Sequence, residues 1–79
     1  MIQLILKSQN GAITNVYNGL DEISNLFNDT SIKTFSDTAQ LAMHLLNNYF
    51  HTTINGVKYY HSNAYFDRNG ISIFTFTQL

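Results

Sequence analysis

Residues 57–78 read VKYYHSNAYFDRNGISIFTFTQ, and most of the fold follows from this stretch. Two runs, 57–66 and 71–78, are rich in β-branched and aromatic residues and flank the sequence DRNG at 67–70. Strands favour such side chains, whereas Asn and Gly tolerate the positive φ angles of tight turns. The stretch therefore predicts two antiparallel strands joined as a hairpin.

A second hairpin is predicted near the N-terminus. Residues 2–7 (IQLILK) and 12–17 (AITNVY) are apolar and β-branched, and an Asn-Gly pair between them is typical of a hairpin turn. A shorter strand from Thr52 to Ile54 is expected to return onto residue 57 through another Asn-Gly pair. The sequence thus provides four or five strands.

Two segments show the period of an α-helix. Residues 20–28 place apolar side chains at i, i+3 and i+7, with Asp21 and Glu22 in the first turn, where the helix dipole favours negative charge. Residues 36–50 form the longer predicted helix, with Ser36 or Asp37 as its N-cap. Residues 30–35 are expected to form either a short strand or a connector.

The longer helix is strongly amphipathic. Successive residues advance by about 100° around a helix axis. One broad arc is then apolar, and it holds Ala39, Leu41, Ala42, Met43, Leu45, Leu46, Tyr49 and Phe50. Such an arc predicts a helix that lies on an apolar surface. The order of elements predicts an α+β fold: one domain over residues 1–79, with a four- or five-stranded antiparallel sheet and two helices packed on one face.

Both faces of the C-terminal hairpin are apolar, yet two helices can cover only one. Alternation of side chains assigns these residues to the first face: Tyr60, Ser62, Ala64, Phe66, Ile71, Ile73, Thr75 and Thr77. The second face holds Val57, Tyr59, His61, Asn63, Tyr65, Ser72, Phe74, Phe76 and Gln78. Small Ser62 and Ala64 would let a helix approach, whereas burying His61 unpartnered would cost about 1–3 kcal/mol. We therefore expect the first face in the core; a core on the second face is the alternative.

On this assignment the second face is exposed and forms a contact surface for another protein. Exposed aromatic patches mark interaction sites, and Tyr is favoured at their centres. The predicted partner-binding residues are Tyr59, His61, Tyr65, Phe74 and Phe76, with Asp21 and Glu22 steering the approach.

Composition excludes several classes of protein. The chain has 79 residues and no Cys, which rules out disulfides and thiolate metal sites. The chain contains four Lys and Arg residues and five Asp and Glu residues. This nearly neutral net charge disfavours direct nucleic-acid binding. No apolar run reaches the ~18 residues of a membrane helix, and residues 1–11 resemble a strand rather than a signal peptide. We expect a cytoplasmic protein that does not bind membranes.

Nothing in the sequence favours catalysis, a metal or a cofactor. His44 and His51 are seven residues apart, beyond the i, i+4 spacing of helical metal ligands. Ser62 adjoins His61, but neighbours in a strand point to opposite faces and cannot form a nucleophile–base pair. Every Gly is isolated, so there is no phosphate-binding loop. We expect no enzyme and no cofactor.

Residues with A/T-rich codons (Phe, Tyr, Met, Ile, Asn, Lys) far outnumber those with G/C-rich codons (Gly, Ala, Arg, Pro). This bias is typical of low-GC bacteria, phages and mobile elements. In size and lack of motif the chain resembles small anti-defence inhibitors, anti-CRISPR proteins among them. That resemblance implies a non-catalytic protein-binding module, encoded by a phage or mobile element, that blocks a host protein or complex sterically. The alternatives are a homodimeric structural or regulatory protein and a small nucleic-acid-binding protein.

Overall fold

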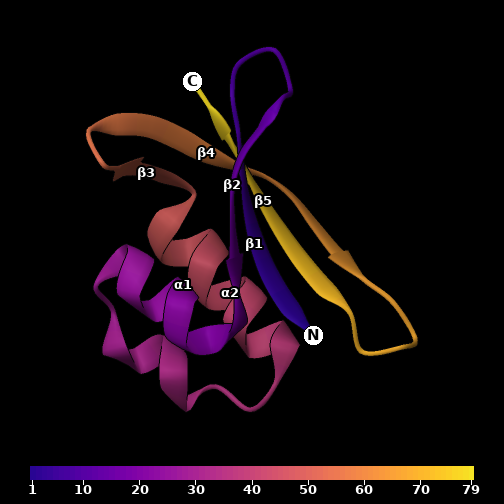
Figure 1. Ribbon diagram of the computed structural model, residues 1–79. Coiled ribbons are helices and arrows are strands. Elements are labelled where there is room, and N and C mark those ends of the chain that lie inside the picture. Colours follow the sequence, from indigo (N-terminus) through magenta and orange to yellow (C-terminus); the bar gives the residue numbers. More distant parts are fainter.

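The computed structural model describes residues 1–79 and has an α+β fold, a five-stranded sheet with helices on one face (Figure 1). In chain order the elements are β1 (Ile2–Lys7), β2 (Ile13–Asn18), α1 (Gly19–Phe27), the 3-10 helix η1 (Thr30–Thr34), α2 (Thr38–Tyr49), β3 (His51–Ile54), β4 (Val57–Phe66) and β5 (Ser72–Gln78). The predicted strands and both predicted α-helices are present. The radius of gyration of 11.6 Å is close to the value of about 12 Å for one compact domain of this length.

The sheet is mixed rather than antiparallel, which corrects the prediction. Its strand order is β2-β1-β5-β4-β3, and β1 runs parallel to β5 from the Ile2–Ser72 pair to the Lys7–Thr77 pair. Each short turn fixes antiparallel pairing only within its own hairpin. No turn joins β1 to β5. Their relative direction is set by how the two hairpins dock beside each other, which local sequence does not specify.

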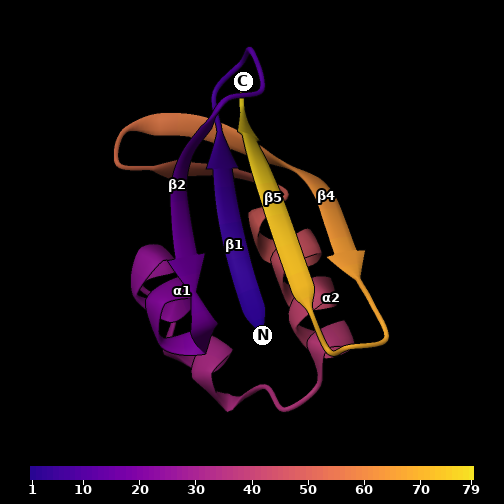
Figure 2. The same ribbon diagram turned by 45° about the vertical axis from the view of Figure 1, so that its right-hand side comes forward.

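The helices form a single layer beneath the sheet. Helix α1 lies under β1 and β2, and α2 lies under the β4 side (Figure 1, Figure 2). Asp37 caps α2, because its carboxylate accepts a hydrogen bond from the Ala39 N–H at 2.8 Å. Residues 30–34 form the 3-10 helix η1 and not a strand, so Ile32 can turn inward and is fully buried. This segment links the two helices.

The core lies on the second face of the C-terminal hairpin, so the expected assignment of faces is wrong. Phe74 and Phe76 are 0% exposed, and Tyr59 and His61 are also buried. The complete core cluster is Leu4, Leu6, Ile23, Ile32, Leu41, Leu45, Ile54, Tyr59, Phe74 and Phe76. Burial of each Phe contributes about 1.5–3 kcal/mol. The two together outweigh the about 1–3 kcal/mol lost by leaving the His61 ring unpartnered.

A β-bulge also changes the faces within β4. His61 is opposite Phe76 and Asn63 is opposite Thr75, so one extra residue of β4 is accommodated between them. A bulge of one residue exchanges the faces of everything beyond it. Phe66 therefore shares the helix side with Phe74, and their ring centroids are 5.9 Å apart. Tyr65 moves to the opposite face, where it lies beside Ile73.

The longest helix, α2, has twelve residues, and no helix of the chain is both long and apolar enough to cross a membrane.

Candidate functional site

The structure does not bring the predicted contact residues together. Tyr59, His61, Phe74 and Phe76 lie under the helices and are buried, so they do not form the expected exposed patch. Tyr65 is exposed, but on the other face of the sheet. The predicted contact group therefore does not exist as one surface, because the helices cover the face that carries its rings.

Asp21 and Glu22 are exposed in the first turn of α1. Glu22 also accepts a hydrogen bond from the Asn18 N–H at 3.2 Å, which ties the start of the helix to the end of β2. Helix α1 lies under β1 and β2, whereas Tyr65 lies on β4, three strands away from β2 in the sheet order. A steering role for the two acidic residues stays a prediction, and it would act from the β2 side.

The uncovered face of the sheet forms the first candidate surface, here called the open face. Side chains alternate along each strand, so residues between the buried ones on β1 and β5 point away from the helices. Figure 2 looks onto this face, with the helices behind it. Its apolar and aromatic members, placed by the pairing register, are Ile5, Ile13, Val16, Tyr60, Tyr65 and Ile73. Ile13, Val16 and Tyr65 are exposed, and the other three are half-buried.

A groove between α2 and β4 forms the second candidate surface. It measures about 340 Å³ and is lined by Ala42, Met43 and Leu46 of α2 and by His61, Ser62, Asn63 and Ala64 of β4. Met43 is 63% exposed and Leu46 50% exposed. The apolar arc of α2 is thus wider than the core it covers, and its outer edge is left in the groove.

The groove adjoins a stretch of β4 that is paired on one side only. Strand β3 pairs with residues Val57 to Tyr60 of β4, and the pairing does not extend beyond Tyr60. The His61 N–H donates to the Phe50 carbonyl at 2.8 Å, and beyond it β4 continues to Phe66 with β5 as its sole neighbour. Figure 2 shows this half of β4 at the right-hand edge of the sheet. We call Ser62–Phe66 the free edge of β4.

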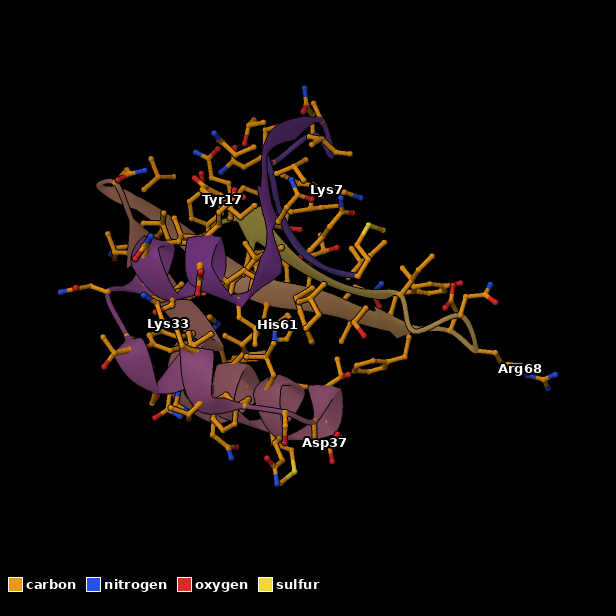
Figure 3. All side chains as sticks on the ribbon, turned by 60° about the horizontal axis from the view of Figure 1, so that its bottom comes forward. Lys7, Tyr17, Lys33, Asp37, His61 and Arg68 are labelled. Carbon is orange, nitrogen blue, oxygen red and sulfur yellow. The ribbon has the colours of Figure 1, made fainter.

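His61 occupies the floor of the groove with neither ring nitrogen hydrogen-bonded. Its ring stacks on Phe76, with centroids 4.6 Å apart and planes 4° from parallel. Figure 3 shows the side chain pointing from the sheet toward the helical layer. Burial lowers the pKa of His61 below its ordinary value of 6.5, since the charged imidazolium would lose its hydration. The ring is therefore neutral at neutral pH.

A separate polar cluster joins η1 to α2. Asp29 Oδ2 accepts hydrogen bonds from His44 Nε2 and from the Tyr49 hydroxyl, both at 2.8 Å. Its Oδ1 accepts from the Ser31 hydroxyl at 2.6 Å and the Ser31 N–H at 3.1 Å. These bonds, those from Ser31 and His44 foremost, hold the pKa of Asp29 well below its ordinary value of 3.8. Nothing in the sequence singled out Asp29 for this role.

The Asp29 cluster contains Ser, His and Asp, but its His is not hydrogen-bonded to the Ser that it would have to activate as a nucleophile. Ser31 and His44 both donate to the same carboxylate, so His44 does not stand between Ser31 and Asp29 as a base would. Burial, together with the bond to Asp29, raises the pKa of Tyr49 to about 12, which keeps its phenol neutral. The arrangement ties the helical layer together. No group of three His, Asp or Glu side chains is placed to hold a metal ion.

No protein-family model matches the chain, and neither a curated protein nor a solved structure is similar enough to match it.

The alternative with the core on the second face leaves Tyr60 and Ile73 uncovered, so sequence reasoning found part of the open face but missed the groove. The width of the apolar arc on the second helix was a usable signal, because eight apolar residues span more than a two-layer core can bury. The bulge in β4 had no comparable signal, since His-Ser-Asn at 61–63 is compatible with a regular strand. Without that bulge Tyr65 would be placed on the wrong face.

Proposed function

We propose that this chain is a non-catalytic protein-binding module, encoded by a phage or mobile element, that blocks a host protein or complex sterically in the host cytoplasm. One observation carries the proposal: the open face exposes apolar and aromatic side chains from four strands, and no helix of the chain covers them. Surfaces of this composition favour association with other proteins.

The chemistry of the open face indicates an apolar partner surface. Tyr60 and Tyr65 combine large apolar area with a polar tip, as residues at the centre of interfaces often do. Alternation along the strands places two cations on this face, Lys7 beside Ile13 and Lys58 two residues before Tyr60, too few to attract a nucleic-acid backbone strongly. Binding should therefore depend weakly on salt, whereas attachment to a nucleic-acid backbone would weaken steeply as salt rises.

The decisive experiment compares two matched variants in direct titration. Wild-type protein first captures a partner from host lysate, and the purified partner is then titrated with each variant. Tyr65→Ala combined with Val16→Ala should raise Kd about tenfold or more, since truncated hot-spot residues cost at least this much. Asn25→Ala, an exposed change on α1, is the control and should leave Kd unchanged.

Two results would contradict the proposal. If the open-face variant binds as tightly as wild type while Asn25→Ala weakens binding, the contact surface is on the helical side. If affinity instead falls in proportion to added salt and the captured ligand is RNA or DNA, the chain is a nucleic-acid binder.

A further inference from the structure

We infer that two copies of this chain pair through the free edge of β4, so that their sheets join into one and α2 of each copy covers the groove of the other. This inference uses a different surface from the open face and does not depend on the proposed function.

The first argument concerns backbone hydrogen bonding. Along an antiparallel strand, alternate residues turn their N–H and C=O groups to opposite sides. On β4 one side is satisfied by β5 as far as the Phe66–Ser72 pair, whereas β3 reaches only Tyr60. Alternate residues of Ser62–Phe66 therefore present unpaired groups to the side facing away from β5. An extended backbone is the partner that satisfies a row of such groups.

The second argument concerns charge. Proteins commonly protect open strand edges with Lys or Pro. The free edge reads SNAYF and has neither, and α2 from Thr38 to Tyr49 contains no Lys, Arg, Asp or Glu. Two copies of this surface can meet without like-charge repulsion. The opposite edge of the sheet differs, because Asp21 and Glu22 lie on the helix beneath it.

The third argument concerns the apolar residues beside the edge, and it favours a second copy over a foreign strand. Met43, Leu46 and Phe66 are 63%, 50% and 48% exposed, although one side of the Phe66 ring lies against Phe74 of the core. A single added strand would pair with β4 but would leave the outer side of α2 in water. A second copy brings its own α2, which covers Met43 and Leu46 with the same residues of its partner.

The geometry of such a pair follows from symmetry. A two-fold axis perpendicular to the sheet runs the two β4 strands antiparallel and keeps both helical layers on the same side. Ala64 is the middle residue of the free edge and the smallest side chain in it. With Ala64 near the axis, no large side chain separates the two α2 helices.

The test measures mass as a function of concentration by analytical ultracentrifugation or light scattering. Wild type should move from 9.0 kDa toward twice that mass as concentration rises. Met43→Glu and Leu46→Glu change exposed groove residues, so the fold should persist while the dimer Kd rises about tenfold or more. Asn47→Glu puts the same charge on the same helix outside the groove and should dimerise like wild type.

A charge exchange distinguishes this interface from any other. Met43→Glu and Met43→Lys should each be monomeric, and an equimolar mixture should recover a dimer, because a two-fold axis places position 43 of one copy near position 43 of the other. Amide hydrogen exchange should slow within Ser62–Phe66 when wild type dimerises. A wild-type chain that stays monomeric at every concentration, or a dimer indifferent to the Met43 and Leu46 variants, overturns the inference.

Discussion

Both faces of the β4–β5 hairpin carry apolar and aromatic side chains, yet the helices cover only one of them. Phe74 and Phe76 on one face are fully buried beneath the helices, whereas Ile73 on the other remains partly exposed beside Tyr65. The comparison shows that residue type alone does not decide which face of a strand enters the core. The position of the helical layer decides it, and aromatic rings left on the other face become a surface for partners.

The largest effect is expected on the face of the β4–β5 hairpin that lies under the helices, here called the covered face. Phe74→Ala removes a fully buried ring and should lower the free energy of unfolding by about 3–5 kcal/mol. Ile73→Ala, one residue away on the open face, should cost no more than about 1 kcal/mol, because much of its side chain already contacts water. Chemical denaturation measures both. Equal losses would mean that the open face is buried in solution.

The next effect concerns the Asp29 cluster, which ties η1 to α2 within the helical layer. Asp29→Asn replaces the charged acceptor of His44, Tyr49 and Ser31 and should lower the free energy of unfolding by about 1–3 kcal/mol. Asp21→Asn, an exposed change on α1, is its control and should stay within about 0.5 kcal/mol.

Acid titration examines the same cluster. The pKa of Asp29 is lower in the folded than in the unfolded chain, so its ionisation stabilises the fold fully above 3.8, and this stabilisation is lost as pH falls below that value. The Asn variant should lack this component. Parallel pH profiles for wild type and Asp29→Asn would contradict the assigned role.

A smaller effect of opposite sign is expected at His61, the polar residue on the covered face. His61→Leu removes two unpartnered ring nitrogens from the core and should leave stability at neutral pH unchanged or raise it by about 1 kcal/mol. A loss as large as that of Phe74→Ala would show that the ring has a partner in solution.

The pH dependence of His61 has a definite sign. The pKa of His61 is lower in the folded than in the unfolded chain. At pH values below 6.5 the imidazole is therefore protonated in the unfolded chain and stays largely neutral in the folded one. Wild type should therefore lose stability as pH falls through the range beneath 6.5, whereas His61→Leu should show less loss there. Denaturation of both proteins over that pH range measures the difference.

The smallest effect on stability is expected for a substitution on the open face. Tyr65→Ala deletes an exposed aromatic ring and should change the free energy of unfolding by no more than about 0.5 kcal/mol. The same change is expected to weaken partner binding. Separation of the two measurements would show that the open face serves binding rather than folding, and a large stability loss would contradict that reading.

Much of the fold was predictable from local patterns. The spacing of apolar residues located both α-helices, Asp37 was identified as a possible cap of α2, and Asn-Gly pairs marked all three hairpin turns. These signals act over a few residues, so a single sequence contains them completely. The 3-10 form of residues 30–34 was missed, because a short connector offers no repeating pattern.

The candidate site was less predictable, for two physical reasons. The bulge at His61–Asn63 exchanges the faces beyond it, and no residue type there demands one. The cost of burying His61 was also judged alone, without the two Phe side chains whose burial outweighs it. Which face is covered depends on the free energy of burial summed over all side chains of the strand pair. No single residue reveals that total.

The central place of β5 has a consequence for how the chain folds. This strand is last in chain order, yet it lies between β1 and β4 and carries Phe74 and Phe76. On the ribosome, the preceding strands and helices would emerge without Phe74 and Phe76, which complete the core around Leu4 and Leu6. Native closure then requires a contact between distant parts of the polypeptide, which slows folding. Assembly of the sheet should thus wait for β5 rather than proceed hairpin by hairpin.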